Sequence, residues 1–403
     1  MSCGEAVSWY ARALVCVPPM PEPLRVRRLG EEDAGSIAEF FRAADWDPHA
    51  TPEGTRDMFR SLAAENPFEP GNGPPTVGVF VGARLAGFVT SIPTRFWNGR
   101  QYAPAHWLKG YWVLEEYRNG PIAFLLLKEM LKQVGLAASM PAALGARQLS
   151  TALGMKDLGA VGDYIAPLRP ARILRRLDIG RFEHLNRLPS PVSFAIKAAR
   201  IAPFAYVAGA PVMLGLAVLR LPGAFAARRL TTQLAERLPE SAALDSLWSR
   251  AQRHLSSSAT RSGAYLSWRY ERGTSGQYRF ASVWRRDDLV GLAVLAHPLR
   301  PDDSRIAGIG IGSVVDLVLD PDCVGALPSV LAVARHWARS ANYDAVILTT
   351  SRRALRGPLL RAGYLPMPGN IHLLVRDPGG KHGLSTDLDA WMVTRGDAWG
   401  DHL

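Results

Sequence analysis

The chain has few cysteines, and this scarcity limits the kinds of protein it can be. Among 403 residues there are three, Cys3, Cys16 and Cys323. None belongs to a Cys-x-x-Cys pair or lies near a histidine pattern, so we expect neither a disulfide framework nor a metal site. The N-terminus also lacks the Lys/Arg-led segment that opens a secretory signal. These absences predict a protein of a reducing, cytoplasmic compartment.

A second missing feature is a basic run with interleaved aromatic residues, which is typical of nucleic-acid-binding modules. We therefore expect no nucleic-acid partner, although Lys and Arg (47) outnumber Asp and Glu (36) and the net charge is +11. Such a charge favours anionic partners, for example coenzyme phosphates or an acidic membrane surface. With 48% hydrophobic and 21% charged residues the composition is globular, and the length predicts two domains.

A strand, a turn and a helix in succession form the clearest functional motif. The strand is Tyr111–Leu114, the turn is Arg118–Pro121, and residues with helical spacing follow from Ile122. We expect Pro121 at the first helical position, where its missing N–H is harmless. Backbone N–H groups at a helix start suit a pyrophosphate, and Arg118 adds a cation. The alternative is an ordinary strand-to-helix turn of an α/β core.

This stretch resembles the acyl-CoA-binding signature of the GNAT (Gcn5-related N-acetyltransferase) superfamily. In that family a Val-x-x-x-x-Arg-x-x-Gly-x-Gly/Ala turn cradles the CoA pyrophosphate, and Val113, Arg118 and Ala123 match it. Pro121 replaces the first Gly, with Gly120 one place early, so one backbone donor is missing. The resemblance implies these cofactor-binding residues: Tyr111, Trp112, Val113, Leu114, Arg118, Asn119, Gly120, Pro121, Ile122 and Ala123.

The surrounding elements follow the order of that family across residues 24–170. We predict strands and helices in this order: Leu24–Leu29, a helix from the capping residue Asp33 to Ala44, Thr76–Val81, Leu85–Ile92, Ala105–Leu114, the helix after Pro121, Leu136–Ser139, the helix Ala142–Leu153 and Val161–Ile165. The predicted fold class is α/β, with a mixed central sheet flanked by helices.

The second half of the chain repeats this order at an offset near 204–209 residues, which indicates an internal duplication. Its predicted elements are Tyr278–Trp284, Leu289–Ala296, Val314–Leu319, the helix Ala326–Arg339 and Tyr343–Thr349. Cys323 corresponds to Arg118, and a neutral thiol cannot replace a guanidinium at a pyrophosphate. We therefore predict a leader (1–22), a GNAT-like domain (23–175), an apolar and basic helical linker (176–240) and a degenerate GNAT-like domain (241–403).

The acid–base candidates are His106, Glu115 and Ser150. The family resemblance implies a Tyr acid on the late helix, where this chain has Ser150, four residues before Gly154. Ser150 would position a water or simply pack in the helix. His106 titrates in the useful range but is equally compatible with a structural role in its strand. Glu115 is either a base or a solvated residue at the turn.

Two aromatic stretches, Tyr265–Tyr270 and Trp391–Asp397, resemble patterns in tandem GNAT-like proteins, some associated with bacterial polysaccharide gene clusters. This likeness implies a sugar-like acceptor held by Trp268, Arg269 and Asp316. The alternative is that the aromatic residues pack in a core and that neighbouring groups satisfy the Asp316 carboxylate.

The linker contains Ile201–Leu219, which has no charged residue and is long enough to span a bilayer. Because a single span would separate the two repeats, we expect a buried or membrane-surface helical pair, with the span as the alternative. Residues 197–229, including Lys197 and Arg228-Arg229, would then lie against an anionic bilayer surface.

The resemblance implies an acyltransferase that moves an acyl group, most simply acetyl, from acyl-CoA to an amine or hydroxyl of a small polar or sugar-like acceptor. Two alternatives stay open. One is a tandem-GNAT ligase that takes an aminoacyl group from tRNA. The other is a non-catalytic, membrane-associated pseudo-acyltransferase.

Overall fold

The computed structural model describes residues 22–68, 73–176, 202–271, 277–297, 308–367 and 369–397. The leader up to residue 21 and Lys197 lie outside these ranges. The chain divides into two compact units that are interleaved in sequence. Unit 1 contains residues up to Val161, Leu255–Thr260 and Asn370–Trp391. Unit 2 contains Gly162–His254, Arg261–Gly369 and the residues from Met392 onward.

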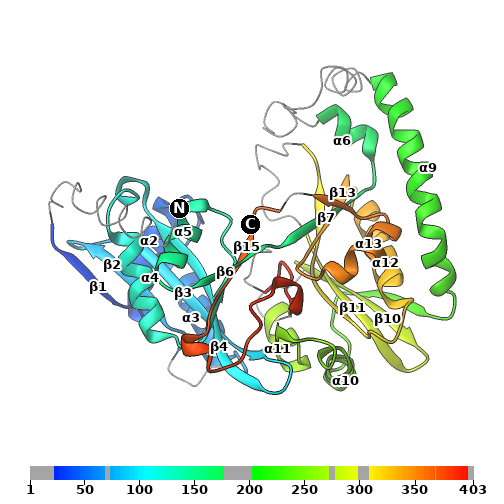
Figure 1. Cartoon of the computed structure of the whole chain (residues 1–403). Helices are drawn as coiled ribbons and strands as arrows, with labels where there is room; N and C mark the ends of the chain where they lie inside the picture. Colours follow the sequence, from blue (N-terminus) through cyan, green and yellow to red (C-terminus); the bar gives the residue numbers. More distant parts are fainter. Residues whose placement is uncertain are drawn as a thin grey trace. The chain divides into compact units, whose positions relative to one another are not determined.

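Unit 1 is built on a mixed sheet with helices on both faces (Figure 1). Its strands are β1 (Leu24–Arg28), β2 (Thr76–Val81), β3 (Arg84–Trp97), β4 (Tyr102–Val113), β5 (Ala137–Ser139) and β6 (Lys156–Ala160). Its helices are α2 (Ala34–Ala43), α3 (Pro52–Ala64), α4 (Ile122–Gln133) and α5 (Leu144–Ala152). The short strand β9 (Ser257–Ala259) pairs with β3 at the sheet's edge.

Helix α4 covers one face of this sheet because its apolar residues recur every three or four positions. Ile122, Leu126 and Met130 are fully buried against β2 and β3. Gly87 of β3 permits this contact, since a Cβ there would lie 2.6 Å from Ile122. On the opposite face, the α2 residue Phe41 packs edge-on against Phe88, with ring centroids 5.4 Å apart.

Two local expectations for unit 1 are wrong, and one helix was not predicted. The Asp33 carboxylate does not cap α2 but accepts hydrogen bonds from the Arg27 guanidinium and from the Gly30 N–H, because an ion pair outcompetes the helix amides. Pro121 is the N-cap residue of α4 and not its first helical residue. Helix α3 was not expected, although Thr51 caps it by accepting a hydrogen bond from Gly54 N–H, with Pro52 at the start.

Unit 2 repeats the arrangement with a second sheet. Its strands are β8 (Thr231–Ala235), β10 (Tyr278–Arg285), β11 (Asp288–Ala296), β12 (Ile311–Leu319), β13 (Ala345–Thr350) and β14 (Leu365–Met367). Its helices include α10 (Ser241–Gln252), α11 (Gly263–Tyr270), α12 (Ala326–Ser340) and α13 (Arg356–Arg361). Helices α12 and α13 bury the main apolar core against the sheet. All five elements predicted for the second half are present.

Each sheet is completed by a strand from the other half of the sequence. Strand β15 (His372–Arg376) lies between β5 and β6 in unit 1, and β7 (Gly162–Pro167) lies between β13 and β14 in unit 2. In Figure 1 the late strand β15 accordingly runs beside the early strand β6. The strand predicted at Val161–Ile165 therefore exists but belongs to the second sheet.

The apolar segment before unit 2's sheet forms one helix, α9 (Ala202–Ala226), so the expected helical pair is wrong. Pro211 and Pro222 lie inside this helix without ending it. Helix α9 packs against the short helix α6 (Pro170–Arg176) and against α12 and α13. By length and composition alone, Gly209–Ala226 could cross a bilayer, with a mean hydropathy of 1.5.

The strand exchange predicts that neither half of the sequence folds alone. A fragment of residues 22–176 lacks β15, and β5 and β6 do not pair with each other, so both would have an open edge. We expect this fragment to lack a cooperative urea transition in near-UV circular dichroism. The control is the same fragment with Asn370–Trp391 appended through a Gly/Ser linker, which we expect to regain a transition. Cooperative unfolding of the short fragment would contradict the prediction.

Candidate active site

The central strand of unit 1 leaves its neighbour partway along its length. Strand β4 pairs with β3 from Tyr102 to Val113, but its parallel ladder with β5 contains only His106 and Trp107. Among the described strands, none pairs with β4 on that side from Leu108 onward. The backbone N–H and C=O groups of this open edge can pair with an extended, amide-containing ligand as another strand would.

A β-bulge explains why β4 diverges at this point. The register against β3 shifts so that Val89 faces two residues, Gly110 and Tyr111. Gly110 has a φ of +65°, a conformation that residues with a side chain rarely adopt. A Cβ at this position would also lie 3.3 Å from the Phe88 ring. Because the extra residue bends the strand, β4 turns away from β5.

The open edge leads directly into the turn and the start of α4. The turn is ordered by backbone hydrogen bonds from Arg118 N–H to Glu115 O (3.2 Å) and from Gly120 N–H to Tyr117 O (3.1 Å). Leu125 N–H makes a helical bond to Pro121 O (3.0 Å), so the amides that precede it point out of the helix end. This end therefore offers donors and the positive pole of the helix dipole to an anion.

The ten predicted cofactor residues lie on this strand, turn and helix start. Some of them expose side chains to a ligand, and others could offer only backbone groups. The side chains of Arg118 and Asn119 are exposed, and Val113, Gly120 and Pro121 are partly exposed. Leu114 and Ile122 are buried, and Trp112 stacks on Trp46 with centroids 5.6 Å apart. The Tyr111 hydroxyl donates to Ala123 O (2.7 Å) and ties strand to helix. Buried members can contribute backbone groups only.

His106 lies before the open edge, at the first of the two β4 positions that pair with β5. Its Nδ1 is 3.2 Å from the Ser91 hydroxyl, and burial lowers its pKa to about 4. The imidazole is therefore neutral at pH 7 and a weak base. These features favour the structural role over the catalytic one.

The other two acid–base candidates are also poorly placed. Glu115 is exposed in the short 3-10 helix Glu115–Tyr117, and the adjacent Glu116 pairs with Arg84 (2.8 Å). Ser150 is buried in α5, where its hydroxyl donates to Ala146 O (2.8 Å), four residues earlier. This contact favours packing in the helix over positioning a water.

A group that the sequence did not reveal lies in unit 1 on the exchanged strand. His372 Nδ1 of β15 is 3.0 and 3.1 Å from the two carboxylate oxygens of Asp157 in β6. Its Nε2 is 2.5 Å from an Arg147 guanidinium nitrogen of α5. Because a guanidinium only donates, Nε2 is the acceptor here and Nδ1 carries the proton toward Asp157. All three side chains are partly exposed.

The position of His372 relates it to the open edge. Its backbone N–H donates to Pro141 O (3.2 Å), just beyond Ser139, the last residue of β5. Since β4 and β5 are parallel, this is the end of the sheet toward which β4 opens. His372 is 225 positions from Arg147 and 215 positions from Asp157 along the chain. Sequence spacing therefore gave no indication of this group.

In unit 2 the corresponding opening is occupied by the chain itself. Strand β12 has a register shift at Val315 and pairs with β13 only as far as Val314. Beyond that point Gly396 N–H donates to Val315 O (2.7 Å), and Thr394 bridges to Thr350 of β13. A Cβ on Gly396 would lie 2.2 Å from the Tyr270 hydroxyl, so the close approach requires glycine.

A buried ion-pair network fixes this C-terminal segment. Arg261 is fully buried and donates to Asp316 (2.7 Å) and Asp397 (2.6 Å). Burial acts to lower the pKa of Arg261, but the charges of the two carboxylates outweigh it and raise that pKa. Asp316 also accepts hydrogen bonds from Tyr270 (3.1 Å) and Thr394 (3.1 Å). The contacts favour the alternative of a satisfied carboxylate.

The remaining substrate candidates are core residues. Trp268 and Arg269 are 4% and 2% exposed, and Trp268 packs 5.6 Å from the Tyr265 ring. Packing is therefore the favoured alternative for this helix. In the part of the chain that the structure describes, no group of three or more His, Cys, Asp or Glu side chains is placed to hold a metal ion.

The chain was compared with protein-family models, curated protein sequences and solved structures. No family model and no curated protein sequence matches the chain. Among solved structures, Saccharomyces cerevisiae N-myristoyltransferase with bound myristoyl-CoA is similar with a TM-score of 0.57 and 13% identity, over 90% of this chain and 84% of that one. A GCN5-related N-acetyltransferase from Kribbella flavida is similar with a TM-score of 0.52 and 14% identity, over 89% and 72%.

The chain has a two-lobed GNAT fold. A probable N-acyltransferase from Enterococcus faecalis V583 is similar over a comparable length, with a TM-score of 0.53 and 14% identity over 88% of this chain and 72% of that one. The predicted fold class, two GNAT-like sheets flanked by helices, is confirmed. At these identities the likeness establishes the fold and leaves the chemistry to the residues of the site.

The lowered pKa of His106 predicts a pH-dependent stability. Because the unfolded imidazole binds protons more readily, this residue's contribution is complete above about pH 6.5 and is lost as the pH falls toward 4. Between pH 7 and pH 5 we expect His106 to account for a fall of about 2 kcal/mol in the free energy of unfolding. Urea titrations of wild type and His106→Asn at both pH values measure it.

The control is His49→Asn, an exposed histidine of the same unit. We expect His49→Asn to keep the wild-type pH dependence and His106→Asn to flatten it. An unchanged slope in His106→Asn would show that His106 titrates normally.

Proposed function

We propose that unit 1 is an acyl-CoA-dependent acyltransferase. The observation that carries this proposal is the parting of β4 from β5 at the Gly110 bulge, directly before the turn at Arg118 and the start of α4. Pantetheine would pair with the open edge of β4, and the pyrophosphate would lie against the helix start and Arg118. The fold likeness to an N-myristoyltransferase crystallised with myristoyl-CoA supports the cofactor class.

The reaction would be direct transfer from the thioester. The lone pair of an acceptor amine or hydroxyl attacks the thioester carbonyl carbon, the C–S bond breaks, and CoA leaves as a thiolate. A β4 backbone N–H at the open edge would stabilise the developing oxyanion. The proton of the nucleophile must pass to a base.

His372 is the base that this arrangement favours. Asp157 holds the imidazole with Nδ1 protonated, so Nε2 is the unprotonated nitrogen that accepts from a donor. Arg147 occupies that acceptor position and would yield it to the incoming nucleophile. In this role the exchanged strand β15 would supply a side chain that the first half of the sequence lacks.

Unit 2 would serve as a non-CoA-binding partner. Its strand opening is filled by Thr394–Asp397, and its turn carries Cys323, a partly buried thiol packed against the core, where unit 1 has Arg118. Both features support the proposal of a degenerate second copy.

The acceptor would be a small molecule with a nucleophilic amine or hydroxyl. We favour acetyl transfer to a small polar or sugar-like amine or hydroxyl, in a cytoplasmic protein of polysaccharide biosynthesis. The intact Arg118 turn supports CoA over an aminoacyl-tRNA donor, and the unprotonated Nε2 of His372 supports an enzyme over a non-catalytic protein.

The cofactor site is tested by calorimetric titration with acetyl-CoA and with longer acyl-CoAs. Arg118 is exposed, so Arg118→Glu should leave the fold intact while placing an anion beside the pyrophosphate. Loss of a charge-assisted contact worth about 1.5–3 kcal/mol predicts binding weaker by roughly 10- to 100-fold. Arg100→Glu, an exposed arginine in the hairpin before β4, is the matched control. Equal affinity in both variants would exclude this turn as the site.

The base is tested by acyl transfer to a panel of amines, followed as release of free thiol. We expect His372→Gln to lower kcat by about 10²- to 10⁴-fold with acyl-CoA affinity unchanged. Asp157→Asn should also lower kcat with affinity unchanged, because it removes the carboxylate that keeps the imidazole proton on Nδ1. Ser150→Ala is the control and should retain activity. A fully active His372→Gln would assign the base elsewhere.

A further inference from the structure

We propose that unit 2 docks on a bilayer containing anionic phospholipid, with α9 lying in the plane of the interface and a lipid phosphate in the cavity beside α6. This inference is independent of the proposed acyl transfer. It rests on an exposed apolar stripe, on a cavity lined with arginines, and on how the two adjoin.

The stripe runs along one face of α9. Leu214, Val218, Leu221 and Phe225 are 68%, 58%, 55% and 59% exposed and follow one another at intervals of four, three and four residues. These intervals place all four side chains on one side of the helix. A monomeric soluble protein rarely leaves such a contiguous row of large apolar side chains in water.

The opposite face of α9 is attached to unit 2, which argues against a transmembrane span. Leu216 is buried, and Gly223 lies against Pro328 of α12. Arg220 Nε donates to the carbonyl oxygen of Ala362 (3.3 Å), the residue that follows α13. A helix that crosses the bilayer would lose these contacts. A helix with one face on a domain and the other apolar face exposed fits the interface instead.

Arginines flank the stripe at both ends. At the C-terminal end Arg228 lies over the Phe225 ring, with its guanidinium carbon 4.1 Å from the centroid. This cation–π contact places a positive charge at the end of the stripe, where headgroup phosphates would lie. At the N-terminal end the charges belong to α6.

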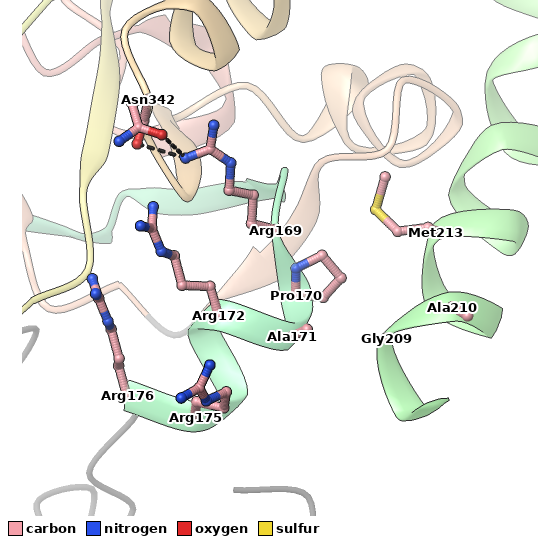
Figure 2. A pocket seen from close by; sticks show the side chains of 10 residues that line it. All are labelled: Arg169, Pro170, Ala171, Arg172, Arg175, Arg176, Gly209, Ala210, Met213 and Asn342. Atoms are coloured by element: carbon pink, nitrogen blue, oxygen red, sulfur yellow. Dashed lines mark hydrogen bonds between the residues drawn. The ribbon is translucent and has the colours of Figure 1, made fainter. Parts of the chain in front are cut away.

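The cavity at that end has a volume of about 800 Å³ (Figure 2). Figure 2 shows that α6 and the residue before it contribute its charged wall, while α9 contributes an apolar wall. Its lining residues are Arg169, Pro170, Ala171, Arg172, Arg175, Arg176, Gly209, Ala210, Met213 and Asn342. Ala210 lies one helical turn before Leu214, so the cavity opens next to the start of the stripe.

Among the residues that the structure describes, the charge of the cavity is only partly compensated. Arg172 and Arg176 pair with the buried carboxylate of Asp344, at 3.2 and 4.0 Å, and Arg169 donates to Asn342 O (2.9 Å). The described lining thus contains four guanidinium groups, two of which share the carboxylate of Asp344. Phosphate oxygens suit such a cluster, and an acyl chain suits the adjoining stripe. An anionic phospholipid combines both groups.

Flotation of the full-length protein with vesicles tests the proposal. We compare vesicles of phosphatidylcholine alone with vesicles that also contain phosphatidylglycerol, at low and high salt. We expect flotation with the anionic vesicles only, weakened by salt. Leu221→Glu with Phe225→Glu, and separately Arg175→Glu, should each weaken binding on the order of tenfold. The controls are Met367→Glu at an exposed position of β14 and Arg253→Glu at the exposed residue directly after α10.

Hydrogen exchange of the wild-type protein gives a readout that does not depend on the variants folding. Anionic vesicles should protect the amides of residues 213–226 and 169–176. Three results would overturn the proposal: no flotation with either vesicle, protection by soluble inorganic phosphate equal to that by vesicles, or a stable dimer whose interface protects α9 without lipid. Equal flotation of the variants and the wild type would also overturn it.

Discussion

Backbone hydrogen bonding by two exchanged strands is the constraint on which both units depend. Strand β15 supplies the ladder partners of β5 and β6, and β7 supplies those of β13 and β14. Without them each sheet would be interrupted by unpaired N–H and C=O groups, which are costly when buried. The two copies of the fold are therefore not independent modules, because each sheet closes only with a strand from the other half.

In our proposal the same exchange also supplies the general base of unit 1. His372 arrives on β15, meets Asp157 on the neighbouring strand β6, and stands at the end of the sheet where β4 leaves β5. The candidates from the first half are less suitable: burial keeps His106 neutral, and Ser150 donates to its own helix. In our proposal the second half of the chain thus contributes a catalytic side chain even though its own cleft is closed.

The two units differ in what occupies the same strand opening. Both contain a bulge in the central strand, at Gly110 and at Val315, and both lose the parallel ladder just beyond it. In unit 1 the opening leads to an exposed arginine at a helix start. In unit 2 the C-terminal segment fills it, held by Arg261 between two buried carboxylates, and removal of that arginine would leave both without a countercharge.

The sequence by itself predicted the central strands and helices of both halves, their repeated order and the turn after β4, because hydrophobic periodicity and turn residues act locally. It predicted neither the partners of β7 and β15 nor the ligands of Asp316, because pairing between distant segments leaves no local pattern. The continuous helix α9 likewise depends on packing that outweighs its internal prolines. Tertiary structure alone brought Asp157 to His372 and left one apolar face of α9 in solvent, since both depend on which surfaces distant segments cover.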